Sequence, residues 1–128
     1  MTSQGIKDGA PVLLVADVEA AANYYRDQLG FRYDQLWGDP PGFCILWRGP
    51  VGLMLSRMDD PAHIVPHRTV SDGLWDAYFW VDDARAMHKE LESRGAAIEY
   101  PPTDKPYGCL EFAVRDLDGY TIAFGQEL

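Results

Sequence analysis

The feature that most constrains the fold of this chain is a repeat at half its length. Asp17 and Gly30 bracket a stretch in which apolar residues recur every three or four positions. Asp82, or its neighbour Asp83, begins a second such stretch that ends at Gly95, again thirteen positions after Asp82. Aspartate commonly caps the start of a helix, and glycine commonly follows its end. The two candidate helices start 65 positions apart in a chain of 128 residues, so the sequence predicts an internal duplication.

Strand-like runs flank both candidate helices in the same order. In the first half they occupy residues 11–16, 31–37, 43–48 and 51–57, and in the second half residues 75–81, 97–100, 109–115 and 120–125. The same 65-position shift carries Cys44 onto Cys109. A strand, a helix and three further strands therefore occur twice, which predicts an α+β fold of two tandem βαβββ modules.

We expect one domain over residues 1–128. Module one is expected at about residues 10–57, a linker at about 58–73 and module two at about 74–127. Each module alone could cover only one face of its sheet, so the two are expected to pack as a pair. The proline-rich residues 101–106 are expected to form a loop.

Acidic side chains outnumber basic ones by 20 to 11, which gives a formal charge of −9 and a pI near 4.5. This field repels phosphate backbones and anionic membrane surfaces and attracts cations, so we expect neither nucleic acid nor membrane as a partner. No apolar run approaches the roughly 18 residues of a membrane span, and the first residues lack the features of a signal peptide. We therefore expect a cytoplasmic protein whose two cysteines are reduced and packed.

Alternation along the strands sorts their residues onto two faces. One face is aliphatic, whereas the other mixes small residues with aromatic and acidic ones. The distinctive members of this second face are Met54, Asp76, Tyr78, Trp80 and Glu111. Aromatic rings with a few polar groups are typical of a ligand pocket, so we predict that these five residues bind a ligand. The alternative is that Tyr78 and Trp80 pack in a subunit interface.

Three further aromatic residues are candidates for the rim of this pocket or for an interface. They are Trp37, Trp47 and Tyr107. Because Pro106 and Gly108 flank Tyr107 in a predicted loop, its ring is placed to close over a ligand. For Trp37 and Trp47, packing in the core or between subunits is an equal alternative.

Several short motifs occur in register with the two modules. They are Val15-Ala16-Asp17, Tyr24-Tyr25, Leu29-Gly30-Phe31, Val81-Asp82, Gly95, Tyr107-Gly108, Glu111-Phe112 and Asp116-Leu117-Asp118-Gly119-Tyr120. In this combination the chain resembles, over about residues 10–127, the vicinal-oxygen-chelate superfamily, which includes glyoxalase I, the extradiol dioxygenases and the bleomycin resistance proteins. The resemblance implies that the modules form a curved mixed sheet that encloses a cavity. Leu117 stands where the family usually has proline, and we expect only a local change there.

Metal-dependent members of that superfamily hold the ion with four inward side chains, typically His or Glu. The resemblance places these positions on Ala10, Met54, Asp76 and Ala123. Three of the four are poor ligands for a divalent ion, and one carboxylate does not make a site. We therefore expect no metal and no other cofactor.

Two alternatives keep catalysis open. One is a metal site in the linker, built from His63, His67, Asp59 or Asp60. The other is an inward pair of carboxylates, Asp76 and Glu111, with raised pKa values suited to acid–base catalysis. The competing interpretation of this pair is a structural or cation-attracting role.

Residues 48–57 and 111–116 most resemble the bleomycin resistance proteins, a metal-free branch. The resemblance implies homodimers that sequester a drug unaltered, in clefts shared between subunits. We therefore expect a homodimer without catalytic residues that binds a cationic or aromatic small molecule, such as a bleomycin-type antibiotic. Acidic charge and stacking rings suit such a ligand. The alternatives are an enzyme of the same superfamily and a fold copy whose role is protein association.

Overall fold

The computed structural model describes residues 5–128 and contains two modules of the same composition. Module one consists of β1 (Val12–Val15), α1 (Val18–Leu29), β2 (Leu36–Trp37), β3 (Phe43–Arg48) and β4 (Val51–Arg57). Module two consists of β5 (Ala77–Trp80), α2 (Ala84–Ser93), β6 (Ala97–Lys105), β7 (Cys109–Arg115) and β8 (Thr121–Glu127). The linker between them holds two short 3-10 helices, η1 (Pro61–His63) and η2 (His67–Thr69).

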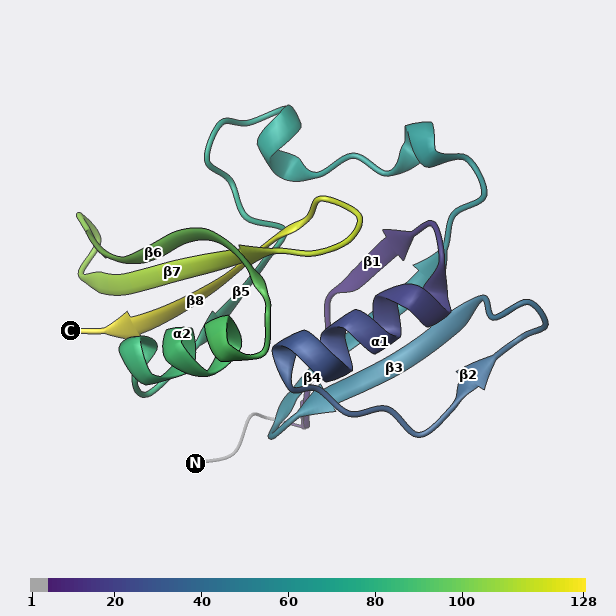
Figure 1. Cartoon of the computed structure of the whole chain (residues 1–128), viewed down its shortest axis with the longest axis horizontal. Helices are drawn as coiled ribbons and strands as arrows, with labels where there is room; N and C mark the ends of the chain where they lie inside the picture. The colour runs from purple at the N-terminus through teal and green to yellow at the C-terminus, as the bar shows by residue number, and fades with distance from the viewer. Residues whose placement is uncertain (1–4) are drawn as a thin grey trace.

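The two modules have the same sheet topology. The strand order is β1-β4-β3-β2 in the first sheet and β5-β8-β7-β6 in the second. In each sheet the first strand pairs in parallel with the last, and the remaining pairs are antiparallel. Figure 1 shows α1 and α2 each lying against the sheet of its own module, while the linker crosses from one module to the other at the top of the view. The predicted fold of two βαβββ modules with mixed sheets is confirmed.

Both helices begin where the sequence predicts. The Asp17 side chain accepts a hydrogen bond from the amide of Ala20 at 3.0 Å, and the Asp83 side chain accepts one from Ala86 at 3.0 Å. These contacts satisfy amides that have no partner inside the helix. Gly30 ends α1 with a φ of 74°, a left-handed conformation that costs glycine little.

The core lies between the helices and the sheets. In module one the buried face of α1 packs on alternate residues of β1, β3 and β4, and in module two Phe112 and Phe124 stack with their ring centroids 5.0 Å apart. Cys44 and Cys109 are both free and buried, as expected. Burial raises the pKa of the Cys44 thiol to about 11, so this thiol stays protonated.

Side chains on the two modules join them directly. The buried Tyr25 hydroxyl of α1 donates to Asp116 Oδ2 at 2.6 Å, in the turn between β7 and β8. Arg48, at the end of β3, donates to both oxygens of Glu90 on α2, at 2.8 and 2.7 Å. The hydrogen bonds from Arg48 lower the pKa of Glu90 to about 2, against the opposing effect of burial. The predicted pairing of the modules therefore has specific polar contacts.

Two predicted boundaries are wrong. Of residues 31–37 only Leu36–Trp37 forms a strand, and Arg32 contributes one isolated bridge to Trp47. The predicted loop at residues 101–106 is instead the second half of β6, which runs to Lys105 with two register shifts. Because β6 is an edge strand, prolines there cost no ladder hydrogen bond on the open side.

The turn that follows β7 keeps its form despite Leu117. Asp116 Oδ1 accepts hydrogen bonds from the amides of Asp118 at 3.0 Å and Tyr120 at 2.9 Å. Leu117 is exposed in this turn. Within residues 5–128 no helix is long and apolar enough to cross a membrane.

Candidate ligand-binding site

Each sheet has one face covered by the helix of its own module and one face, here called the open face, that points away from that helix. In module two Phe112 packs against His88 of α2, with ring centroids 5.4 Å apart, so alternation along β7 turns Glu111 to the open face. Strand pairing then places Trp80 opposite Gly125 and Gly125 opposite Glu111. His88 is a half-buried packing residue of α2.

Glu111 is a fully buried carboxylate with hydrogen bonds from neutral side chains. Trp75 Nε1 donates to Oε2 at 3.2 Å, the Tyr100 hydroxyl also donates to Oε2, and the Tyr107 hydroxyl donates to Oε1. Burial acts to raise the pKa of Glu111, but these hydrogen bonds outweigh it, so the pKa lies below its ordinary value. The carboxylate is therefore ionised at neutral pH, and the raised pKa expected for acid–base catalysis is wrong for Glu111.

The tyrosines around this carboxylate are held in their neutral form. Burial and the negative charge of Glu111 raise the pKa of Tyr78, Tyr100 and Tyr107 well above the ordinary value, and for Tyr100 and Tyr107 the hydrogen bond to Glu111 adds to the shift. All three phenols therefore keep their protons at neutral pH. The Tyr78 hydroxyl oxygen is buried and has no hydrogen-bond partner among residues 5–128.

Aromatic rings continue from this carboxylate to the surface. The ring of Trp75 lies edge-on to Tyr78 at 4.7 Å and to Tyr107 at 6.4 Å, and Tyr78 lies edge-on to Trp80 at 5.3 Å, between ring centroids. Trp80 is 67% exposed and Tyr107 is 53% exposed. We call this cluster the Glu111 cage; it comprises Trp75, Tyr78, Trp80, Tyr100, Tyr107 and Glu111.

A glycine makes room for the cage. A Cβ atom at Gly125 would lie 1.9 Å from the Tyr78 hydroxyl oxygen and 2.6 Å from the ring carbon that carries it. The Tyr78 ring can therefore lie against the sheet only because position 125 has no side chain. A glycine also makes room for an aromatic ring in module one, since a Cβ at Gly52 would lie 2.8 Å from the Trp47 ring.

The structure brings together four of the eight predicted site residues. Tyr78, Trp80, Tyr107 and Glu111 all belong to the cage. Trp75 and Tyr100 belong to it as well, but the sequence did not single them out as site residues. Trp75 precedes β5, where alternation fixes no face, and Tyr100 lies between the two register shifts of β6. Such shifts leave no periodic signal in a sequence.

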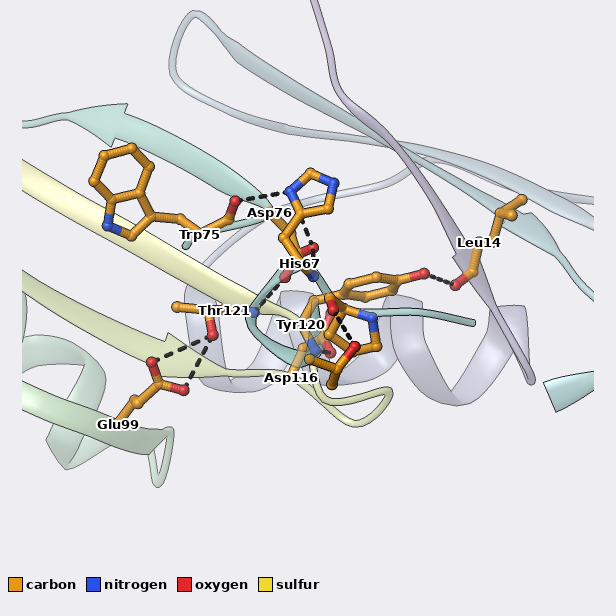
Figure 2. Close-up of polar contacts among 10 residues, drawn as sticks. Leu14, His67, Trp75, Asp76, Glu99, Asp116, Tyr120 and Thr121 are labelled. Carbon is orange, nitrogen blue, oxygen red and sulfur yellow. Dashed lines mark hydrogen bonds and ion pairs between the residues drawn. The ribbon is translucent and has the colours of Figure 1, made fainter. Parts of the chain in front are cut away.

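Asp76 has a different role from Glu111. Figure 2 shows Asp76 close to His67 and Thr121. Its Oδ1 accepts a hydrogen bond from the amide of His67 at 2.9 Å, and its Oδ2 accepts one from the amide of Thr121 at 2.9 Å. His67 Nδ1 also lies 3.0 Å from the carbonyl oxygen of Trp75. With its side chain only 3% exposed, Asp76 ties the linker to the start of β8.

The two acids do not form a pair. The amide of Asp76 bonds the carbonyl of Thr121 at the start of β8, whereas Glu111 lies opposite Gly125 near the end of that strand. The two carboxylates accept hydrogen bonds from separate sets of donors. An acid–base pair made of Asp76 and Glu111 therefore has no geometric basis in this chain.

The remaining three predicted residues lie on module one. Met54 of β4 is half-buried on the open face, where it pairs with Val12 of β1. Trp47 lies over Gly52, and Trp37 lies beside Phe43, with ring centroids 5.9 Å apart. Met54, Trp37 and Trp47 therefore belong to a second apolar surface, on a different sheet from the Glu111 cage.

The positions that hold metal in related folds do not suit a metal here. Among residues 5–128, no group of three or more His, Cys, Asp or Glu side chains could hold an ion. Ala10 and Ala123 offer no donor atom, and both oxygens of Asp76 already accept backbone amides. In the linker His63 lies 3.9 Å from Asp60, which is a single contact. The donor set does not fit a resident divalent ion.

A cavity of about 500 Å³ opens at the seam between the modules. Its aromatic lining comes from Phe31, Phe79 and Phe124, with Arg48 at its edge. Of the eight predicted site residues only Trp80 lines it. The seam cavity and the Glu111 cage thus share one exposed indole.

Comparisons with known proteins agree with the fold described above. The sequence profile of the glyoxalase/bleomycin resistance protein/dioxygenase superfamily matches residues 9–124. The chain belongs to this superfamily. The solved bleomycin-binding protein of bleomycin-producing Streptomyces verticillus, complexed with copper(II)-bleomycin, is 30% identical in sequence with a TM-score of 0.72. That match covers 96% of this chain and 98% of that chain.

Two other solved structures share the fold at lower sequence identity. The bleomycin resistance determinant encoded on the transposon Tn5 has a TM-score of 0.73 at 22% identity, over 95% of this chain and 98% of that chain. TnmS3, an antibiotic binding protein from Streptomyces sp. CB03234, has a TM-score of 0.70 at 22% identity, over 94% and 95%. No curated protein matches the sequence significantly.

Proposed function

We propose that this protein binds and sequesters a cationic or aromatic small molecule, of the bleomycin type, without a metal of its own and without altering the ligand. The observation that carries the proposal is the Glu111 cage, in which exposed rings surround a buried anion. Exposed Trp80 and Tyr107 offer faces for stacking on flat rings, and the ionised Glu111 favours positive charge. Sequestration needs affinity alone, and this arrangement supplies it.

Two further findings support the proposal. The bleomycin-binding relative from Streptomyces verticillus shares 30% of its residues over nearly the whole chain, and its structure contains the drug. In addition, of the positions that hold metal in other members of the superfamily, Asp76 alone carries a carboxylate here, and both of its oxygens accept backbone amides, which argues against metal-dependent chemistry at these positions.

We propose that the active form is a homodimer. The open face of module one carries exposed and half-buried apolar residues, among them Val12, Met54 and Trp47, and the open face of module two carries the cage. A second copy could set module one of one subunit against module two of the other. Met54, Trp37 and Trp47 would then contribute to the same ligand cleft as Tyr78, Trp80, Tyr107 and Glu111, while Asp76 would hold the linker beside it.

Calorimetric titration tests this function directly. Chelator-treated protein is titrated with metal-free bleomycin and, separately, with copper(II)-bleomycin. The bound drug is then released, and its mass is measured by mass spectrometry. We expect saturable binding of at least one form and an unchanged drug mass. Trp80→Ala should weaken binding about tenfold or more, because exposed tryptophans commonly dominate binding energy, whereas Val70→Ala, in the exposed linker, should not.

Three results would contradict the proposal. These are an absence of heat and of thermal shift at millimolar drug, a covalently changed drug, and stoichiometric metal in protein purified without chelator. The second and third would favour an enzyme of the same superfamily. Dimer loss in Trp80→Ala with unchanged ligand affinity would instead place Trp80 in an interface alone.

A further inference from the structure

We propose that Glu111 Oε1 anchors a positively charged nitrogen of the ligand, and that Tyr107 is the specificity-determining gate whose hydroxyl holds this oxygen until the ligand displaces it. This inference rests on the proposed function, because it concerns the same site. It adds the charge that the site selects and the residue that controls access to it.

The two oxygens of Glu111 have different kinds of partner. Oε2 accepts hydrogen bonds from Tyr100 of β6 and from Trp75 Nε1, which are part-buried side chains within the cage. Among residues 5–128, the Tyr107 hydroxyl alone donates to Oε1. Tyr107 is 53% exposed and lies in the short turn between β6 and β7. One oxygen is therefore held inside the protein, and the other is held by a surface residue.

Tyr107 lies beside a glycine in an exposed turn. The next residue, Gly108, has a φ of 82°, a left-handed conformation that glycine adopts at little cost, and a side chain there would meet nothing within 4 Å. The ring of Tyr107 contacts Trp75 only edge-on, at 6.4 Å between centroids. In the proposed gate, Tyr107 rotates away from Oε1 while Trp75 and Tyr100 keep their hydrogen bonds to Oε2.

The charge of Glu111 has no cationic partner. Within residues 5–128 none of the ion pairs includes Glu111, so its buried charge is compensated only by neutral donors. A buried ion gains most from a partner of opposite charge, because the low dielectric strengthens their attraction. A ligand ammonium or amidinium at Oε1 would supply this attraction, which the phenol of Tyr107 cannot.

The cage already accommodates one cation. The ammonium nitrogen of Lys105 lies 4.6 Å from the centroid of the Tyr100 ring, within the range of a cation–π contact. Lys105 ends β6, next to the turn that holds Tyr107. The rim of the cage is therefore an environment in which positive charge is favourable, and the overall charge of −9 steers cations toward the protein.

A matched pair of dyes tests the charge preference. At pH 8, 9-aminoacridine is a cation and acridine is neutral, and both present the same flat ring system. Quenching of tryptophan fluorescence, with Trp75 and Trp80 in the cage, reports binding of either dye. We expect wild-type protein to bind 9-aminoacridine at least about tenfold more tightly than acridine, and Glu111→Gln to reduce this ratio to about twofold or less.

Tyr107→Phe tests the gate, because it removes the hydroxyl and keeps the ring. Without a competitor at Oε1, the affinity for 9-aminoacridine should rise about three- to tenfold, while the affinity for acridine stays within about twofold. Tyr33→Phe is the matched control, since the Tyr33 hydroxyl bonds Asn23 in module one, away from the cage. It should change neither affinity. Tyr107→Phe remains informative if Glu111→Gln fails to fold.

Each other outcome overturns the inference in a recognisable way. Equal binding of both dyes to wild-type protein would show that the site selects rings and not charge, and would leave the proposed function standing. Weaker binding of the cation by Tyr107→Phe would make the Tyr107 hydroxyl a ligand contact and not a gate. Failure of both dyes and of bleomycin to bind would remove the inference together with the proposed function.

Discussion

At the scale of single residues, neighbours decide what each acidic side chain can do. Alternation placed Asp76 and Glu111 on the same kind of face, and both are buried. Asp76 accepts two backbone amides and so fixes chain segments, whereas Glu111 accepts only side-chain donors, one of which is half exposed. A donor on a side chain can be replaced by a ligand without unfolding the backbone. Glu111 is therefore the better candidate for recognition.

Gly125→Ala should destabilise the protein and disturb the cage. The added methyl group would lie 1.9 Å from the Tyr78 hydroxyl oxygen and 2.6–2.9 Å from two of its ring carbons, so the ring must leave its place over β8. Overpacking of this kind typically costs about 1–3 kcal/mol. Urea denaturation should show the loss as a lower midpoint, together with altered tryptophan fluorescence. Gly42→Ala is the control, because a Cβ there meets nothing within 4 Å; equal stability of the two variants would show that Tyr78 does not need the space.

The residues of the cage could be predicted only in part. Tyr78, Trp80 and Glu111 lie within regular strands, where a period of two assigns each side chain to a face. Trp75 lies outside such a strand, and Tyr100 follows a register shift that changes the phase. The sequence shows which aromatic residues are present. It does not show the register shifts that decide which of them face Glu111.

At the scale of elements, local signals were sufficient for both helices and for the regular strands. The caps at Asp17 and Asp83 act through contacts three residues away, so they can be recognised in the sequence. The extension of β6 cannot be recognised in this way, because its prolines predict a loop. Only their place on a sheet edge makes them compatible with a strand. The position of a strand within a sheet is a tertiary property.

The turn between β7 and β8 should make stability depend on pH. Burial raises the pKa of Asp116 from 3.8 to about 6, although Tyr25 and two backbone amides donate to it. A raised pKa means that the folded state binds this proton more tightly than the unfolded state. The contribution is present below about pH 4 and is lost as pH rises through about 6, a change of about 3 kcal/mol in the free energy of unfolding.

Asp116→Asn isolates this contribution. The amide oxygen still accepts the backbone amides, and the amide nitrogen can donate to the Tyr25 hydroxyl, but the side chain no longer titrates. The stability of the variant relative to wild type should therefore rise between pH 4 and pH 7, as measured by urea denaturation. Asp8→Asn, at an exposed position, serves as the control. Parallel pH profiles for wild type and Asp116→Asn would show that Asp116 titrates normally in the folded protein.

At the scale of the whole molecule, duplication explains the fold and also why one face of each sheet has no helix on it. Each module buries one face of its sheet under its own helix, and the modules join through contacts such as Tyr25 with Asp116 and Arg48 with Glu90. These contacts are made by the two helices, the end of β3 and the turn between β7 and β8, and the open faces take no part in them. The repeat was visible in the sequence, whereas the contacts that join its copies link residues 42 and 91 positions apart, a separation at which sequence shows no pattern.

The open face of module one should therefore be a dimer contact. Val12 is 56% exposed on β1 and pairs with half-buried Met54 on β4, so the edge of this sheet presents apolar surface to solvent. Sedimentation should show wild-type protein as a dimer, and Val12→Lys should shift it toward monomer, because a charge would be buried between apolar surfaces. Val70→Lys, at a more exposed position in the linker, should leave the dimer intact. If Val12→Lys remains dimeric while ligand binding is unchanged, the subunits associate through another surface and the ligand cleft does not include module one.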